Sequence, residues 1–182
     1  MIFTLLFACN PQAQNTAAIF AIDIREYHMM DDFNSWTYRD DAPDSSDTLP
    51  DEAQLMLAQN EGGIVNFRRG SRWIEAQDVG SMEWSIDEGL TLQSWNLPMG
   101  SGTGPVPLSS AEPEDGDVLS DGDWTCTLSR PESMWTFYAE YDSVLYFDCD
   151  SSSISLDIFF AKRAGLIHLQ TSDYELDLVA PW

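Results

Sequence analysis

The sequence predicts a mainly β protein, a curved antiparallel sheet or half-barrel of about ten strands with long acidic loops and little helix. Three observations lead to this class. Apolar and polar residues alternate with a period of two in one segment after another. Residues typical of turns, mainly glycine, proline and aspartate, separate these segments. The apolar fraction of 43% is that of a chain with a packed core.

The first alternating segments lie before residue 98. Each carries apolar residues at every second position, as expected of a strand with one buried face. In chain order these residues are Phe20, Ile22 and Ile24; Trp36 and Tyr38; Val65 and Phe67; the stretch from Trp73 to Ala76; Met82, Trp84 and Ile86; and Leu90 and Leu92. Helical spacing appears only over residues 51–59, after Pro50, and predicts one short helix there.

Residues 98–123 interrupt the alternation with repeated glycine and proline. We expect a long surface loop there, because too little chain remains on either side for two separate cores. Alternation then returns and continues to the end of the chain. Its apolar positions are Trp124, Cys126 and Leu128; Trp135, Phe137, Ala139 and Tyr141; Leu145, Phe147 and Cys149; Ile154, Leu156, Ile158 and Phe160; and Tyr174, Leu176 and Leu178.

The net charge of −23, from 31 acidic residues against 8 Lys and Arg, excludes one class of partner. A surface of this charge repels nucleic acid and anionic lipid headgroups. We therefore expect no DNA- or RNA-binding role.

The chain opens with an apolar run that is too short to span a bilayer. It resembles the end of a bacterial lipoprotein signal, in which residues 6–9 form the lipobox and Cys9 is the acylated first residue of the mature protein. We expect a truncated signal-like segment over 1–8, a tether over 9–16 and a single β domain over 17–182. The resemblance implies a lipid anchor in the bacterial cell envelope, on the periplasmic side or at the cell surface. The alternative is that residues 2–8 form a first β-strand.

The three cysteines favour export as well. An odd cysteine in an exported protein needs an explanation, and lipidation of Cys9 supplies one. Cys126 and Cys149 each lie on the apolar face of a predicted strand, where side chains of neighbouring strands can meet and form a disulfide. The alternative is that both are buried free thiols in a cytosolic protein.

Two segments resemble a group of bacterial lipoproteins of unknown function. Tyr27–Arg39 (Y-H-M-M-D-D-F-N-S-W-T-Y-R) resembles the opening pattern Y-x-P-L-x-x-G-N-x-W-x-Y of that group. Phe160–Ile167 (F-A-K-R-A-G-L-I) resembles its F-A-K-G-V-G-L-V stretch, with Arg163 in place of a glycine, and a final Y-E-L strand follows at Tyr174–Leu176. The group is similar to half-barrel periplasmic lipoproteins that cradle acyl chains. The resemblance therefore implies an apolar ligand and no catalytic residues.

The residues offer little support for catalysis. The chain has two histidines, His28 and His168, and none of the common hydrolase or metalloprotease motifs. Gly100–Gly104 is rich in glycine like a phosphate loop, but prolines follow where a helix has to begin, so a flexible loop is the better interpretation. His168 lies on a strand after Gly165, and we expect it at the solvent edge. Among so many acids, a pair of close carboxylates carries no information about glycoside hydrolysis.

Acidic residues around a loop suggest one cation. Asp115, Asp117, Asp121 and Asp123 offer the hard oxygen ligands that Ca²⁺ prefers. Their spacing departs from the EF-hand pattern, because Leu119 falls where the third ligand belongs. A solvated acidic loop is the alternative. Two distant histidines and two paired cysteines make no zinc site.

Trp73, Trp84 and Trp95 recur at an interval of eleven residues. Such a row of aromatic side chains is able to stack on sugars or apolar ligands. Trp84, however, shares its face with apolar neighbours, whereas Trp95 is out of phase with Leu90 and Leu92. A packed aromatic core is therefore the better interpretation.

The sequence as a whole predicts an envelope lipoprotein that acts as a binding or interaction module and is not an enzyme. Its curved sheet holds an apolar ligand or docks an envelope protein. A structural surface protein without a small-molecule ligand is the alternative, and a hydrolase with a hidden site is a weaker one.

Overall fold

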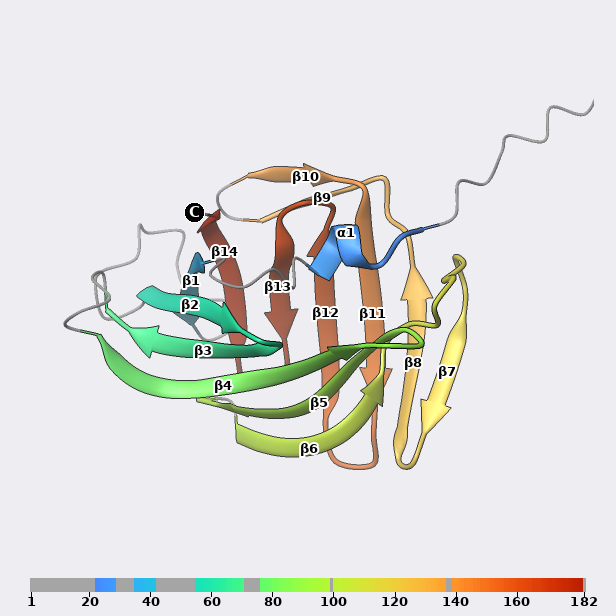
Figure 1. Ribbon diagram of the computed structural model, residues 1–182, viewed down its shortest axis with the longest axis horizontal. Coiled ribbons are helices and arrows are strands. Elements are labelled where there is room, and N and C mark those ends of the chain that lie inside the picture. Colours follow the sequence, from blue (N-terminus) through green and yellow to red (C-terminus); the bar gives the residue numbers. More distant parts are fainter. Residues whose placement is uncertain are drawn as a thin grey trace, which may run out of the picture.

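The structure, a computed structural model, describes residues 22–28, 35–41, 55–70, 76–98, 100–136 and 139–181. Within these ranges the chain forms one short helix and fourteen strands (Figure 1). The helix is α1 (Arg25–His28). The strands are β1 (Ser35–Asp41), β2 (Leu55–Glu61), β3 (Ile64–Arg69), β4 (Gln77–Ile86), β5 (Leu90–Leu97), β6 (Gly100–Pro107), β7 (Val118–Asp121), β8 (Trp124–Ser129), β9 (Ser133–Trp135), β10 (Glu140–Asp142), β11 (Val144–Asp150), β12 (Ser155–Ala161), β13 (Gly165–Gln170) and β14 (Glu175–Pro181).

Twelve of these strands form one antiparallel sheet in the order β6-β5-β4-β3-β2-β1-β14-β13-β12-β11-β8-β7. The sheet curls until β6, at one edge, contacts β7 and β8 near the other edge, so the barrel is nearly closed. The remaining strands, β9 and β10, pair with each other at the end of the barrel that carries α1 (Figure 1). The predicted curved antiparallel sheet is confirmed.

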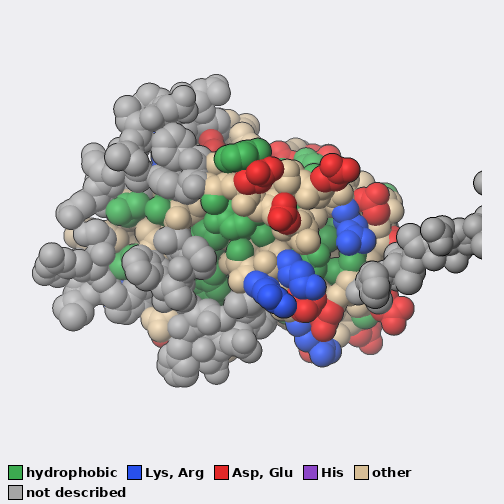
Figure 2. Space-filling model, turned by 90° about the horizontal axis from the view of Figure 1, so that it is seen from above, with side chains coloured by type: hydrophobic (Ala, Val, Ile, Leu, Met, Phe, Trp, Pro, Cys, Tyr) green, Lys and Arg blue, Asp and Glu red, His purple; other side chains and the backbone are tan. Residues whose placement is uncertain are grey.

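Alternation places every second side chain of these strands inside the barrel. On β12, for example, Leu156, Ile158 and Phe160 are buried, whereas the residues between them are at least partly exposed. Cys126 on β8 lies directly opposite Cys149 on β11, with a Cα–Cα distance of 4.0 Å, and the two form the predicted disulfide. Seen from the α1 end, hydrophobic side chains gather at the centre of the face (Figure 2).

The predicted helix over residues 51–59 is wrong in its described part. Residues 55–61 form β2, in which Met56, Ala58 and Asn60 are buried and alternate with more exposed residues. β2 pairs with β1 on one side and β3 on the other. The two ladders satisfy its backbone groups, and this tertiary context overrides the weak local helical spacing.

The predicted loop over residues 98–123 is also wrong in part, because it contains β6 and β7. These are the two edge strands of the sheet. An edge strand tolerates glycine and proline because one of its sides carries no ladder, and this is why Pro105 and Pro107 fit in β6. Only residues 108–117 between the two strands remain a loop.

Two shorter segments differ from the predicted strands. Ile22 and Ile24 are buried but lie outside any strand, in the approach to α1, where the side chain of Asp23 accepts a hydrogen bond from the N–H of Arg25 at 3.1 Å. The predicted strand through residues 135–141 is instead the β9–β10 hairpin. Phe20, Trp73 and Phe137 lie outside the described residues.

A β-bulge explains the phase of Trp95. Across β4 and β5, Trp84 pairs with Leu92 and Glu83 pairs with Ser94, which leaves Gln93 as an extra residue. The extra residue shifts the alternation, so Trp95 turns inward and is 5% exposed. Its ring meets that of Trp124 edge to face, with centroids 5.8 Å apart. The prediction of a packed aromatic core is confirmed for Trp84 and Trp95.

Candidate functional site

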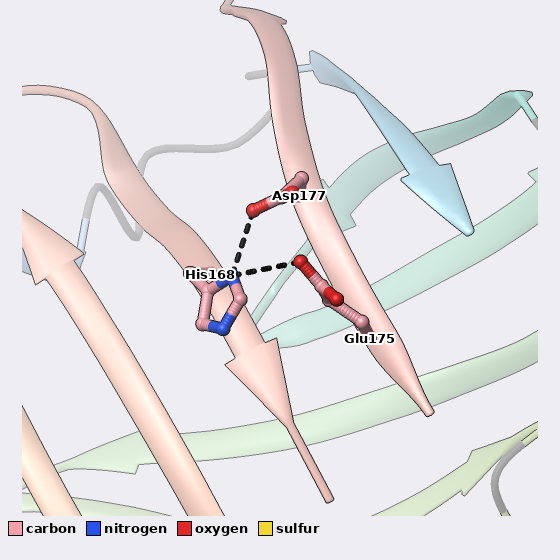
Figure 3. Close-up of side chains that lie close together, drawn as sticks. All are labelled: His168, Glu175 and Asp177. Carbon is pink, nitrogen blue, oxygen red and sulfur yellow. Dashed lines mark hydrogen bonds and ion pairs between the residues drawn. The ribbon is translucent and has the colours of Figure 1, made fainter. Parts of the chain in front are cut away.

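The most concentrated group of polar side chains lies on β13 and β14 (Figure 3). His168 on β13 is directly opposite Asp177 on β14, and its Nδ1 is 2.7 Å from Asp177 Oδ1. Glu175 is two residues before Asp177 on the same face, with Oε1 4.0 Å from Nδ1 of His168. All three side chains point away from the core, since the neighbouring residues Leu169 and Leu176 face inward.

Despite this outward direction, the central pair is buried: His168 is 6% exposed and Asp177 is 7% exposed. The expectation that His168 lies at the solvent edge is therefore wrong. Part of the cover comes from Phe159 on β12, whose ring meets the imidazole edge to face at 5.4 Å. Tyr146 on β11 stacks on Phe159 in turn, at 4.3 Å.

The partners of His168 favour the imidazolium form. Burial opposes protonation, but the hydrogen bond and charge of Asp177, helped by the charge of Glu175, outweigh it and raise the pKa of His168. The second ring nitrogen, Nε2, is 3.5 Å from Oε1 of Gln170. Both ring nitrogens thus face oxygen acceptors, and only the imidazolium has two N–H donors.

A second cation completes the charge balance. Arg39 on β1 is directly opposite Asp177 across the other side of β14. Burial and the neighbouring Asp177 raise the pKa of Glu175, while His168 and Arg39 act in the opposite direction. Two cationic and two carboxyl side chains therefore share this part of the sheet.

His168, Glu175 and Asp177 form the one group of three His, Cys, Asp or Glu residues, among those described, whose ligand atoms all lie within 4.8 Å of one another. One imidazole and two carboxylates are a donor set that zinc or manganese accepts. The protonated ring and the neighbouring guanidinium already neutralise the carboxylates, however. The arrangement fits a buried ion-pair network better than a metal centre.

Catalysis also finds little support in this group. A carboxylate that orients a histidine is typical of general-base sites. In the part of the chain that the structure describes, the polar partners of the imidazole are two carboxylates and one amide. Among the described residues, none of these three polar partners is a hydroxyl or a thiol that acts as a nucleophile.

The His168–Asp177 pair marks the point where β13 and β14 separate. The two strands pair over only three residues each, and His168–Asp177 is the last pair. Beyond it, the indole N–H of Trp36 donates to the carbonyl of Ala164 at 3.0 Å, and the hydroxyl of Tyr38 donates to the carbonyl of Leu166 at 2.9 Å. Side chains of β1 thus take the place of ladder bonds from β14.

A small cavity lies behind these side chains, inside the barrel. Its volume is about 20 Å³, and aromatic and aliphatic side chains line it, among them Trp36, Tyr38, Trp84 and Leu166. Such a space holds roughly one water molecule. This cavity by itself is too small for an apolar ligand such as an acyl chain.

The predicted calcium ligands are not brought together. Asp115 accepts the N–H of Arg130 at 2.9 Å, and Asp117 accepts the N–H of Glu114 at 2.8 Å. Asp123, in the β7–β8 turn, accepts hydrogen bonds from Ser152 in the β11–β12 turn. Asp121 begins the β7–β8 turn, and the four carboxylates contain no cluster of three. Calcium binding stays a prediction.

Cys9, the predicted lipidation site, lies outside the described residues.

The most exposed large apolar side chain among the described residues is Trp135 on β9, at 72%. The β9–β10 hairpin that carries it is held by a hydrogen bond from Ser133 Oγ to Glu140 Oε1 at 2.9 Å. Its turn is closed by the backbone bond from Thr136 N–H to the carbonyl of Ala139, at 2.9 Å.

Sequence reasoning missed the pairing of His168 with Asp177. One signal was present: a tight turn over residues 171–174 joins the two strands and places residue 168 opposite residue 177. A charged pair at opposed positions of a hairpin is a cross-strand contact that the sequence permits one to predict.

Fold and site together define a nearly closed antiparallel β domain with a buried imidazole–carboxylate pair in its wall. The chain matches no protein-family model, no curated protein and no solved structure. No described helix is long and apolar enough to cross a membrane.

Proposed function

We propose that this protein is a bacterial envelope lipoprotein, anchored through Cys9, whose β domain docks a partner protein of the envelope through the β9–β10 hairpin. The observation that carries the docking role is the indole of Trp135, which is 72% exposed on a hairpin outside the main sheet. Tryptophan is among the residues most enriched at binding hot spots, so an exposed indole on a hairpin outside the main sheet suits a docking contact.

The charges around Trp135 indicate the chemistry of the partner. Glu132, Glu140 and Asp142 are exposed near it on the same hairpin and its approach. The whole chain carries a net charge of −23. A partner with a basic rim around an apolar pocket complements this surface, and association with it slows as salt is added.

Two further observations support the proposal. The Cys126–Cys149 disulfide is of the kind that forms in oxidising compartments outside the cytosol, and it leaves Cys9 as the odd cysteine. The cavity behind Trp36 and Tyr38, at about 20 Å³, is too small for an apolar ligand, which favours docking over ligand transport. A purely structural surface protein, the second candidate, has no need of the exposed indole.

Mass spectrometry of the protein from the membrane fraction of its own host tests the anchor. We expect a mature chain that begins at Cys9 and carries acyl groups, and a Cys9→Ser variant that lacks them. An unmodified chain that begins at Met1 contradicts the anchor. A co-purifying apolar molecule favours ligand transport instead.

Photo-crosslinking in living cells tests the docking surface. A photoreactive residue at position 135 is expected to capture one basic envelope protein, less efficiently as salt rises. The matched control is position 118, because Val118 is also exposed and apolar, at 59%, but lies on β7. Equal capture from both positions, or undiminished binding of that protein to Trp135→Ala, contradicts the proposal.

A further inference from the structure

We infer that the barrel wall opens between β13 and β14, and that the His168–Asp177 pair is the latch at the base of this opening. We call the separated part of the two strands the fork: Gly165–Ile167 on β13 and Leu178–Pro181 on β14. This inference is independent of the proposed docking role and of the lipid anchor.

Two β-bulges give the fork a physical cause. Across β12 and β13, Phe159 pairs with His168 and Phe160 with Leu166, which leaves Ile167 as an extra residue. Across β1 and β14, Tyr38 pairs with Leu178 and Thr37 with Ala180, which leaves Val179 as another. A bulge bends and twists its strand. Both lie just beyond the latch, where the strands separate (Figure 1).

The fork is closed by side chains instead of a backbone ladder. Trp36 donates one hydrogen bond to the carbonyl of Ala164, just before β13, at 3.0 Å, and Tyr38 donates one to the carbonyl of Leu166 on β13, at 2.9 Å. A side-chain bond breaks by rotation of one side chain, whereas separating paired strands breaks several backbone bonds at once. Among the paired strands of the twelve-stranded sheet, β13 and β14 share the fewest residue pairs, so theirs is the ladder that opens at the lowest cost.

The same side chains form the inner wall of the cavity. Trp36, Tyr38 and Leu166 both close the fork and line the space of about 20 Å³ behind it. Rotation of the two aromatic side chains enlarges this space and exposes the core residues Phe67 and Trp84 beyond it. Opening of the fork and access to the apolar interior are consequently one event.

The latch is electrostatic, and every packed element contributes to its surroundings. Asp177 and Glu175 of β14 and Gln170 of β13 face the imidazole. β12 contributes the ring of Phe159, and β1 contributes Arg39, opposite Asp177. From β10, Tyr141 lies close enough to Asp177 for that charge to help raise the pKa of its phenol.

The charge of His168 sets the strength of the latch. With the ring protonated, the two cations balance the two carboxyl groups. When the ring loses its proton, Asp177 keeps a neutral partner, and Arg39 alone is left to offset the repulsion between Asp177 and Glu175. The burial of His168 opposes its charge, but its carboxyl neighbours raise its pKa. The latch therefore holds below that raised value and weakens as the pH rises through it.

Hydrogen–deuterium exchange with mass spectrometry tests this on the intact protein, with rates corrected for intrinsic chemical exchange. In His168→Gln we expect roughly tenfold faster exchange in peptides that cover the fork, the size expected for one charge-assisted hydrogen bond. Peptides that cover β4 and β5 are expected to be unchanged. The matched control is Asp78→Asn, which breaks the Arg68–Asp78 pair between β3 and β4 and leaves exchange in the fork unchanged.

The pH dependence of exchange in the wild-type fork is a second measurement. A pair that only holds the fold together, without a change of charge, gives no such dependence. The corrected exchange of the wild-type fork is expected to rise as the pH increases from the ordinary histidine pKa of 6.5 through the raised pKa of His168, and His168→Gln removes this rise. Two results overturn the inference: fork exchange in His168→Gln equal to that of the wild type, or a wild-type rate that is independent of pH. An equal increase in all strands of the variant also overturns it, because the pair then stabilises the whole domain and not the fork.

Discussion

The indole N–H of Trp36 donates to the carbonyl oxygen of Ala164 at 3.0 Å, although 128 residues separate the two in the chain. The bond joins β1 to the end of the β12–β13 turn, although β14 lies between β1 and β13 in the sheet. It satisfies a carbonyl where β13 has lost β14 as a partner, and it places the indole against the cavity inside the barrel. The bond from Trp36 thus lies both where the β13–β14 ladder ends and beside the cavity inside the barrel.

Removal of Asp177 is expected to be costly. Asp177→Ala leaves a buried imidazolium without its partner, and we expect the free energy of unfolding to fall by roughly 3 kcal/mol. Urea denaturation at neutral pH measures it. Asp78→Ala is the control, because the Arg68–Asp78 pair is largely exposed on the Asp78 side and such pairs contribute little. A loss in the control as large as that in Asp177→Ala contradicts this prediction.

The stability of the wild-type protein is expected to depend on pH through His168. Its folded pKa is raised above the ordinary 6.5, so the stability it contributes is complete below 6.5 and is lost as the pH rises through the folded pKa. Urea midpoints measured across this range are expected to fall in the wild type and to fall less in His168→Gln. Parallel curves for the two proteins contradict the assignment.

Glu175 is expected to destabilise the fold at neutral pH. Burial and the nearby Asp177 raise its folded pKa above the ordinary 4.5, so its ionisation reduces stability as the pH rises through that range. Glu175→Gln is therefore expected to raise the thermal midpoint at neutral pH, with the gain disappearing below 4.5. A lower midpoint for the variant at neutral pH shows that the attraction to His168 and Arg39 outweighs the burial.

Tyr38 is expected to stabilise the closed fork through its hydroxyl group. The side chain is buried, and burial raises the pKa of its phenol, so the hydroxyl stays a donor to the carbonyl of Leu166. Tyr38→Phe keeps the ring and is expected to cost about 1 kcal/mol of unfolding free energy. Urea denaturation measures the loss. A variant as stable as the wild type contradicts the role of this bond.

The disulfide is expected to stabilise the domain by constraining the unfolded chain. Cys126 and Cys149 are separated by 23 residues, and closing a loop of this length contributes about 3 kcal/mol. The double variant Cys126→Ala/Cys149→Ala is expected to unfold at correspondingly lower urea concentration. Reduction of the wild type is the control, because it breaks the disulfide but keeps both cysteine side chains. It therefore separates the loss of the disulfide from the loss of packing at the two alanines. A double variant with an unchanged midpoint contradicts the prediction.

Much of the sheet could be predicted because the signal is local. In β12, Leu156, Ile158 and Phe160 recur at every second position, and this period shows by itself which face is buried. The same reasoning predicted the disulfide, since two cysteines on inward faces only need neighbouring strands. β2 was missed because its residues have helical spacing. The strand is stabilised by its ladders with β1 and β3, which the sequence of the segment alone does not indicate.

The candidate site was largely beyond such reasoning. The hairpin register sets His168 opposite Asp177, but nothing local shows that Phe159 covers the imidazole or that Arg39 lies beyond the carboxylate. The phase of Trp95 depends on a bulge at Gln93 that exists only in the pairing of β5 with its neighbours.

The sequence alone determined a mainly β domain, the inward residues of strands such as β12 and the disulfide, because period-two alternation within such a strand requires no knowledge of its neighbours. The tertiary structure decided where the sheet bends and opens. Bulges at Ile167 and Val179, the two side-chain bonds from β1 and the burial of His168 all depend on which strands lie side by side. That adjacency is a property of the closed sheet and of no single segment.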